Sequence, residues 1–159
     1  MILAKKYLLV ALVSMVPFIE LRAAVPMAVS MDLPYLPSLV ICAFANMVPV
    51  PLIYFFARKV LHWGANKPYI GKFFTFCLEK GENAGHKLRQ KTGRGGLFLA
   101  LMLFVGIPLP GTGAWTGTLA ASFLDMGIKS TVLSVCLGVL LAGVIMGIAS
   151  TGVLSVFGI

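Results

Sequence analysis

Two long apolar runs, residues 35–57 and 130–157, constrain the fold most because neither contains a charged side chain. A helix needs about 20 apolar residues to cross the hydrocarbon core of a bilayer, so each run is long enough to cross it once. Hydrophobic residues make up 59% of the chain and charged residues 11%, whereas soluble domains carry about 25% charged residues. The sequence therefore predicts an all-α integral membrane protein.

Each long run is preceded by a pair of shorter apolar stretches that flank a polar or Pro/Gly break. The first pair is 7–19 and 23–31, and the second pair is 97–107 and 114–124. A helix of about 11 residues rises about 16 Å, which is roughly half of the hydrocarbon core. We expect each pair to enter the membrane, turn at the break and leave on the same side, as a re-entrant helical hairpin.

This pattern divides a single membrane domain into two halves that share hydropathy but not sequence. Repeat A covers about 1–57, a basic loop covers 58–96, and repeat B covers about 97–159. We expect inverted repeats, each a re-entrant hairpin followed by a transmembrane helix, with both termini outside the cell. Alternatively, 7–30 and 97–124 cross fully as kinked helices, and both termini lie inside.

The basic residues are concentrated in the loop between the two repeats. Nine of the thirteen Lys and Arg residues lie between Arg58 and Arg94, and the net charge is +8. Cytoplasmic loops of membrane proteins carry such an excess of positive charge. We therefore expect a multi-pass protein of the inner (plasma) membrane with the loop in the cytoplasm, near anionic lipid head groups. A single loop between apolar blocks argues against nucleic acid as a partner.

Metal, cofactor and catalytic chemistry have no support in the pattern of Cys and His residues. The cysteines Cys42, Cys77 and Cys136 are widely spaced and odd in number, and His62 and His86 are isolated. No CxxC or HExxH motif is present, so we expect no metal site, no cofactor and no disulfide framework. We also expect that the protein is not an enzyme.

Glu20 and Arg22 are the first candidate site residues because they interrupt an apolar segment. A charged side chain inside a membrane segment costs about 3 kcal/mol on insertion scales and usually has a function. If Pro17 and Pro26 hold the backbone extended, both side chains point to one side. Arg22 is then a candidate clamp for an anion and Glu20 a candidate proton carrier. Alternatively, the two charges mark a membrane end near the interface.

The second break supplies the other half of the predicted site. It consists of Pro108, Leu109, Pro110, Gly111, Thr112 and Gly113. Its prolines remove backbone donors and its glycines permit unusual dihedral angles. Free N–H groups near 114–117 could hold an anionic group, with Thr112 and Trp115 as side-chain contacts. Paired interrupted segments are typical of transporter sites, although a kink that serves packing is the alternative.

Two weaker signals lie in the long apolar runs. Asn46 is a candidate ligand for a substrate, but a single Asn in a span is as often a helix–helix contact. Gly143-x-x-x-Gly147 is a small-xxx-small face that packs either within the chain or between two chains. A homodimer is expected because one small chain offers little surface to enclose a path.

Two motifs resemble the signatures of a known family. Residues 17–26, PFIELRAAVP, resemble the PxxELRxAxP signature of the small multidrug export protein family. Residues 107–117, IPLPGTGAWTG, are similar to that family's second signature, PLPGTGAWTG. The family looks distantly related to the DedA-like, or VTT-domain, membrane proteins. That relation implies two facing re-entrant hairpins and the flipping of lipids such as polyprenyl phosphates. The DedA pattern has its arginine in the second hairpin, whereas Arg22 lies in the first.

Three functional hypotheses follow from these features. The first is a transporter that resembles DedA-like lipid flippases and moves an anionic amphipathic substrate, such as a polyprenyl phosphate lipid carrier, with Glu20 handling a proton. The second is a proton-driven small multidrug exporter of lipophilic cations, in which Glu20 is the essential anion. The third is a non-transporting membrane assembly protein. In each case membrane lipids are the expected partners.

Overall fold

The computed structural model describes residues 2–67, 71–109 and 111–157, and in these ranges the chain forms helices and no β-strand. The all-α prediction is confirmed. The seven helices are α1 (Ile2–Met15), α2 (Glu20–Ser30), α3 (Tyr35–Met47), α4 (Pro49–Ala65), α5 (Gly71–Gly106), α6 (Ala114–Phe123) and α7 (Ile128–Phe157).

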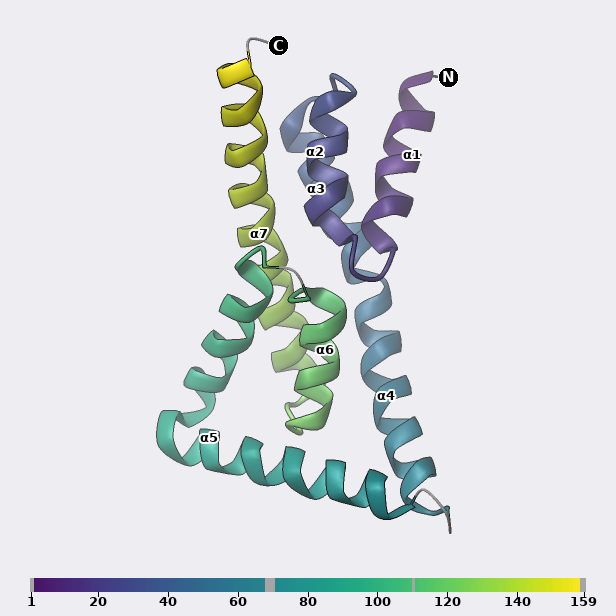
Figure 1. Ribbon diagram of the computed structural model, residues 1–159, viewed down its shortest axis with the longest axis vertical. Helices are drawn as coiled ribbons and strands as arrows, with labels where there is room; N and C mark the ends of the chain where they lie inside the picture. The colour runs from purple at the N-terminus through teal and green to yellow at the C-terminus, as the bar shows by residue number, and fades with distance from the viewer. Residues whose placement is uncertain (1, 68–70, 110, 158–159) are drawn as a thin grey trace.

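Two helical segments run most of the length of the molecule (Figure 1). The first consists of α3 and α4, which continue one another across Val48 from Tyr35 to Ala65 with a mean hydropathy of 2.1. The second is α7, in which Ile128–Ser150 has a mean hydropathy of 2.6. Both are long and apolar enough to cross a membrane. Pro49 is tolerated at the start of α4 because the first turn of a helix needs no backbone N–H there.

Large apolar side chains cover the outer surfaces of these long segments. Phe44, Leu52, Phe56 and Ile148 are each about 70% exposed. A contiguous apolar surface of this kind would be unfavourable in water but is the normal lipid-facing surface of a membrane helix. The exposed side chains therefore agree with the apolar runs in indicating a membrane protein.

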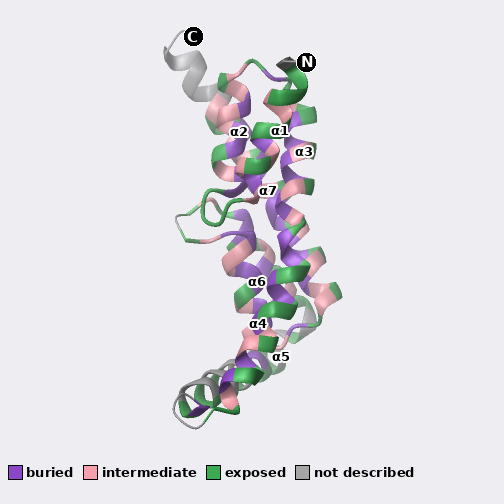
Figure 2. Ribbon diagram, turned by 90° about the vertical axis from the view of Figure 1, so that its right-hand side faces the viewer, coloured by how far each residue is buried: buried purple, intermediate pink, exposed green. Residues whose placement is uncertain are grey.

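Two helical hairpins occupy opposite ends of the molecule (Figures 1 and 2). The helices α1 and α2, joined by residues 16–19, form one hairpin. The second part of α5 and α6, joined by residues 107–113, form the other. Helix α1 has 14 residues, α2 has 11 and α6 has 10, so each is shorter than the hydrocarbon core is thick. The connections of both hairpins lie near the middle of the molecule.

The first part of α5 lies across the end of the bundle opposite to the start of α1 and the end of α7 (Figure 1). Helix α5 is broken at Gly93, whose φ of 67° and ψ of −178° are not helical, and the chain turns there into the bundle. Gly85 lies against the backbone of Leu124, where a Cβ atom would overlap the carbonyl group. The stretch 58–96, predicted as a loop, is therefore mostly helical and packs on the bundle.

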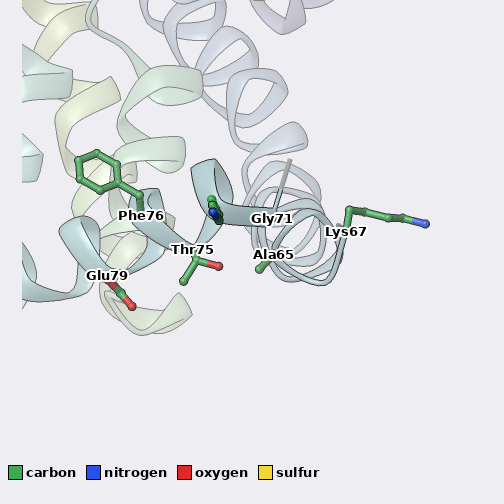
Figure 3. Close-up of a pocket in the computed structure, with 7 residues that line it drawn as sticks. Ala65, Lys67, Gly71, Thr75, Phe76 and Glu79 are labelled. Carbon is green, nitrogen blue, oxygen red and sulfur yellow. The ribbon is translucent and has the colours of Figure 1, made fainter. Parts of the chain in front are cut away.

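An open groove separates the end of α4 from the start of α5 (Figure 3). Its lining includes Lys67, Thr75, Phe76 and Glu79. The Lys67 ammonium lies 4.8 Å from the ring centroid of Trp63, within the range of a cation–π contact. This groove lies at the crosswise helix, far from the middle of the molecule where the two breaks meet.

The small-xxx-small face of α7 packs within the chain. A Cβ atom on Gly143 would overlap Leu39, and one on Gly147 would overlap the ring of Tyr35. The Tyr35 hydroxyl donates a hydrogen bond to the Gly143 carbonyl at 3.0 Å. Of the two alternatives for this motif, the structure supports contact with α3 of the same chain.

A close backbone approach also occurs between α5 and α7. A Cβ atom on Gly138 would lie 2.7 Å from the carbonyl oxygen of Met102 and 2.7 Å from the Cβ of Val105. Backbone cannot move aside as a flexible side chain can. Gly138 therefore sets the distance between these two helices.

We predict that Gly138→Ala lowers the midpoint of thermal unfolding in detergent micelles. Overpacking costs about 1–3 kcal/mol, which outweighs the gain of about 1 kcal/mol in helix propensity. Gly95→Ala is the matched control, because a Cβ there meets nothing within 4 Å, and it should raise the midpoint slightly. Shifts of the same sign in both variants would contradict this account of the packing.

Candidate functional site

The first break is a strained turn between α1 and α2. Phe18 has a φ of 65° and Glu20 a φ of 53°, in the left-handed region that non-glycine residues rarely adopt. Helix α2 begins at Glu20, so Glu20 and Arg22 lie in its first turn. The prediction of an extended backbone through these residues is wrong. The break lies over residues 16–19 instead, where Pro17 ends the preceding helix.

The Glu20 carboxylate binds the N-terminus of α6. Its Oε2 accepts a hydrogen bond from the Ala114 backbone N–H at 3.2 Å, and its Oε1 accepts one from the Trp115 backbone N–H at 3.0 Å. Such N–H groups have no partner within their helix and carry partial positive charge. Glu20 is 4% exposed. The position predicted for an anionic group of a substrate is thus occupied by a carboxylate of the protein.

Gly113 makes this contact sterically possible. A Cβ atom at this position would lie 2.7 Å from Cδ of Glu20 and would overlap the carboxylate oxygens. Any other residue would push Glu20 away from α6. Gly111 has a different role, because its φ of 84° shapes the turn before α6 and favours glycine.

Arg22 binds the opposite side of the same break. Its guanidinium donates to the carbonyl of Leu109, to the carbonyls of Val105 and Ile107 at 3.4 Å each, and to Thr112 Oγ1 at 2.7 Å. These carbonyls belong to the C-terminus of α5 and the residues after it, where the helix dipole is negative. Thr112 Oγ1 also lies 2.9 Å from the carbonyl oxygens of Ile107 and Leu109.

The two charges of the first hairpin therefore bind the two helix ends of the second hairpin. The carboxylate of Glu20 binds an N-terminus, the guanidinium of Arg22 binds a C-terminus, and each match has the favourable sign. Within the described residues, the ion pair that the structure shows is between Arg58 and Asp125, and Arg22 has no carboxylate within ion-pair distance. Its guanidinium instead donates to backbone carbonyls and to the Thr112 hydroxyl.

Three prolines were also predicted as site residues. Pro108 is half-buried in the connection before α6. Pro110 lies outside the described residues. Pro26 was predicted to border the site, but it lies inside α2, about 9 Å along the axis from Glu20, with its helix intact. Pro26 therefore does not hold the backbone extended, because α2 tolerates the proline instead of opening at it.

Asn46 is buried and Trp115 is half-buried, and each has one buried polar atom without a partner. Asn46 is 1% exposed, near the end of α3. Its Oδ1 and the indole Nε1 of Trp115 are both inaccessible to solvent and have no hydrogen-bond partner in the described part of the chain.

Sequence reasoning missed a second polar contact, which joins α4 to the turn between α6 and α7. Arg58 pairs with Asp125, and the Tyr54 hydroxyl donates to the carbonyl of Met126. Asp125 lies in the turn after α6 and has a φ of 52°. The available signal was that Arg58 and Asp125 each border the end of an apolar stretch.

The fold and this junction define a small all-helical membrane protein in which two interrupted hairpins contact each other through charged side chains. Residues 20–145 match the family described as "Putative small multi-drug export protein", and the chain belongs to this family. The matched range begins at Glu20 and includes the second break and both long apolar segments. Neither a curated protein nor a solved structure matches the chain.

We predict that Glu20→Ala destabilises the protein by about 3 kcal/mol, because two buried N–H groups of α6 lose their partners at about 1–3 kcal/mol each. Glu20→Gln should cost less, since an amide oxygen still accepts one of the bonds. Thermal unfolding in detergent measures both. Glu79→Ala, at an exposed position on the crosswise helix, is the control and should change the midpoint little. Equal midpoints for Glu20→Ala and Glu79→Ala would contradict the role of Glu20.

Proposed function

We propose that the protein is a proton-coupled transporter of small amphipathic compounds, and that the junction of the two breaks is its gate. Membership of the family supports export across a membrane, and the long apolar segments support a multi-pass protein of the inner (plasma) membrane. The observation that carries the proposal is the pair of hydrogen bonds from Ala114 and Trp115 to Glu20.

In this proposal the hairpins are re-entrant and the two halves are inverted repeats. Supporting this are the short helices, the placement of both connections near the middle, and one long segment after each hairpin. Irregular backbone at membrane depth must be buried in protein or line a water-filled cavity. Here Arg22 binds carbonyls of the second connection, whereas residues 16–19 are exposed and in this proposal line such a cavity. The positive crosswise helix then lies in the cytoplasm, opposite to the start of α1 and the end of α7.

Glu20 is the acid that links a proton to this gate. The other four acidic residues lie in turns or on the crosswise helix and are Asp32, Glu79, Glu82 and Asp125. A proton on the Glu20 carboxylate removes its negative charge and with it the attraction to the positive end of α6. Proton uptake therefore weakens the hold of the first hairpin on the second. A weaker junction opens the path between them.

Arg22 decides which substrate this path accepts. A lipophilic cation fits the family description, and for such a substrate Arg22 is a hindrance while Glu20 is the essential charge. An anionic lipid such as a polyprenyl phosphate is the second candidate, as the resemblance to DedA-like flippases implies. The Arg22 guanidinium is half-buried and, within the described residues, has no carboxylate at ion-pair distance. This favours the anionic lipid, because guanidinium matches phosphate geometry.

The first test is ethidium flux driven by a pH gradient in liposomes that contain the purified protein. We expect Glu20→Gln to reduce the flux at least tenfold, because the isosteric amide cannot carry the proton, and Arg22→Ala to retain it. Glu79→Gln makes the same chemical change at an exposed position and should transport as the unmodified protein does. Full activity of Glu20→Gln would contradict proton coupling through this residue.

The second test is the movement of a fluorescent polyprenyl phosphate between the leaflets of the same liposomes. If the lipid is the substrate, Arg22→Ala abolishes the movement and Arg22→Lys restores part of it, since Lys keeps the charge but loses the bidentate geometry. Rates equal to those of empty liposomes for both ethidium and the lipid would contradict transport. That result would favour the non-transporting assembly protein.

A further inference from the structure

The unpartnered atoms of Asn46 and Trp115 are complementary in their hydrogen-bonding chemistry. The Oδ1 atom of Asn46 is an acceptor and the indole Nε1–H of Trp115 is a donor. Leaving such a buried group without a partner costs about 1–3 kcal/mol, and folded proteins pair nearly all of them. Two such atoms in one small bundle therefore indicate that something else pairs with them.

The helix register places both residues at one depth. Helices α4 and α6 are in contact and run in the same direction (Figure 1), and the Ser122 hydroxyl donates to the Tyr54 carbonyl at 3.4 Å. Seven residues, or about two turns, before Ser122 is Trp115 in α6. Seven residues before Tyr54 is Met47 at the end of α3, next to Asn46. Because two turns return to nearly the same face, Trp115 lies on the side of α6 that Ser122 turns toward α4.

We propose that Asn46 and Trp115 together bind one hydroxyl oxygen. That oxygen accepts the hydrogen bond of the indole N–H and donates its own hydrogen to the Asn46 oxygen. Both side chains are neutral, so no ionic group is required. A carboxylate or phosphate without a proton has no hydrogen to donate to Asn46. The hydroxyl belongs either to water or to an amphipathic alcohol that enters from the lipid.

The site lies beside the contact that holds the two hairpins together. The backbone N–H of Trp115 donates to Glu20 at 3.0 Å, and the indole Nε1 of the same residue is one of the two atoms of the proposed hydroxyl site. A bound hydroxyl therefore places an oxygen near the Glu20 carboxylate at the depth of the junction. The role of this hydroxyl site in transport rests on the proposed function, but the occupancy of the site can be measured without a transport assay.

The experiment uses the intrinsic fluorescence of Trp115. The chain has two Trp residues, so Trp63→Phe leaves Trp115 as the sole emitter in the full-length protein in liposomes. Adding Asn46→Leu removes the acceptor at similar volume, and we expect a blue shift because the indole loses its hydrogen-bonded oxygen. Ser38→Ala is the control in the same helix, because the Ser38 hydroxyl is buried but bonds to the Pro34 carbonyl. Identical emission with and without Asn46→Leu would overturn the proposal.

The source of the hydroxyl is identified in the protein that retains Asn46, so the test does not depend on the folding of Asn46→Leu. Exchange of H₂O for D₂O raises the emission yield if water is bound. Addition of 1-decanol gives a saturable shift, which decane does not, if an alcohol is bound. A protein that responds to neither D₂O nor 1-decanol has no hydroxyl at Trp115, and the proposal is then wrong. If the Trp115 fluorescence responds but neither ethidium nor the lipid is transported, the hydroxyl site is supported and only the proposed function is contradicted.

Discussion

The contact between the Glu20 carboxylate and the first N–H groups of α6 is the interaction on which the rest of the structure depends. A chain that turns in the middle of a membrane leaves backbone donors and acceptors without partners, and lipid supplies none. Glu20 satisfies donors at the start of α6, and Arg22 satisfies carbonyls at the end of α5. Because the first hairpin carries the charges that these backbone groups bind, the second hairpin depends on the first.

The signs of these charges explain how a structural contact can also be a gate. Glu20 meets the positive end of a helix and Arg22 the negative end, so both matches stabilise the closed junction. In the proposed function, a proton on the carboxylate weakens one side of the junction, and the guanidinium on the other side keeps its charge for a substrate.

The surroundings hold the two hairpins at the distance that this contact requires. Glycines permit close approaches, with Gly138 against α5 and Gly113 against Glu20. At the end of the bundle, the pair of Arg58 with Asp125 joins α4 to the turn after α6. The outer faces of the long helices remain apolar, so polar contacts are concentrated where the backbone is irregular.

The sequence alone determined the all-helical class, the two long spans and the approximate positions of the breaks, because apolar runs must be long to cross a membrane and because Pro, Gly and charged residues interrupt the shorter runs. It did not determine which groups Glu20 and Arg22 bind, since those partners lie about 90 residues away in the chain. Nor did it place the first turn correctly. The left-handed dihedrals at Phe18 and Glu20 and the intact helix at Pro26 run against local preference. At Glu20, the contacts with the start of α6 can outweigh the local preference, and those contacts exist only once the second hairpin is in place.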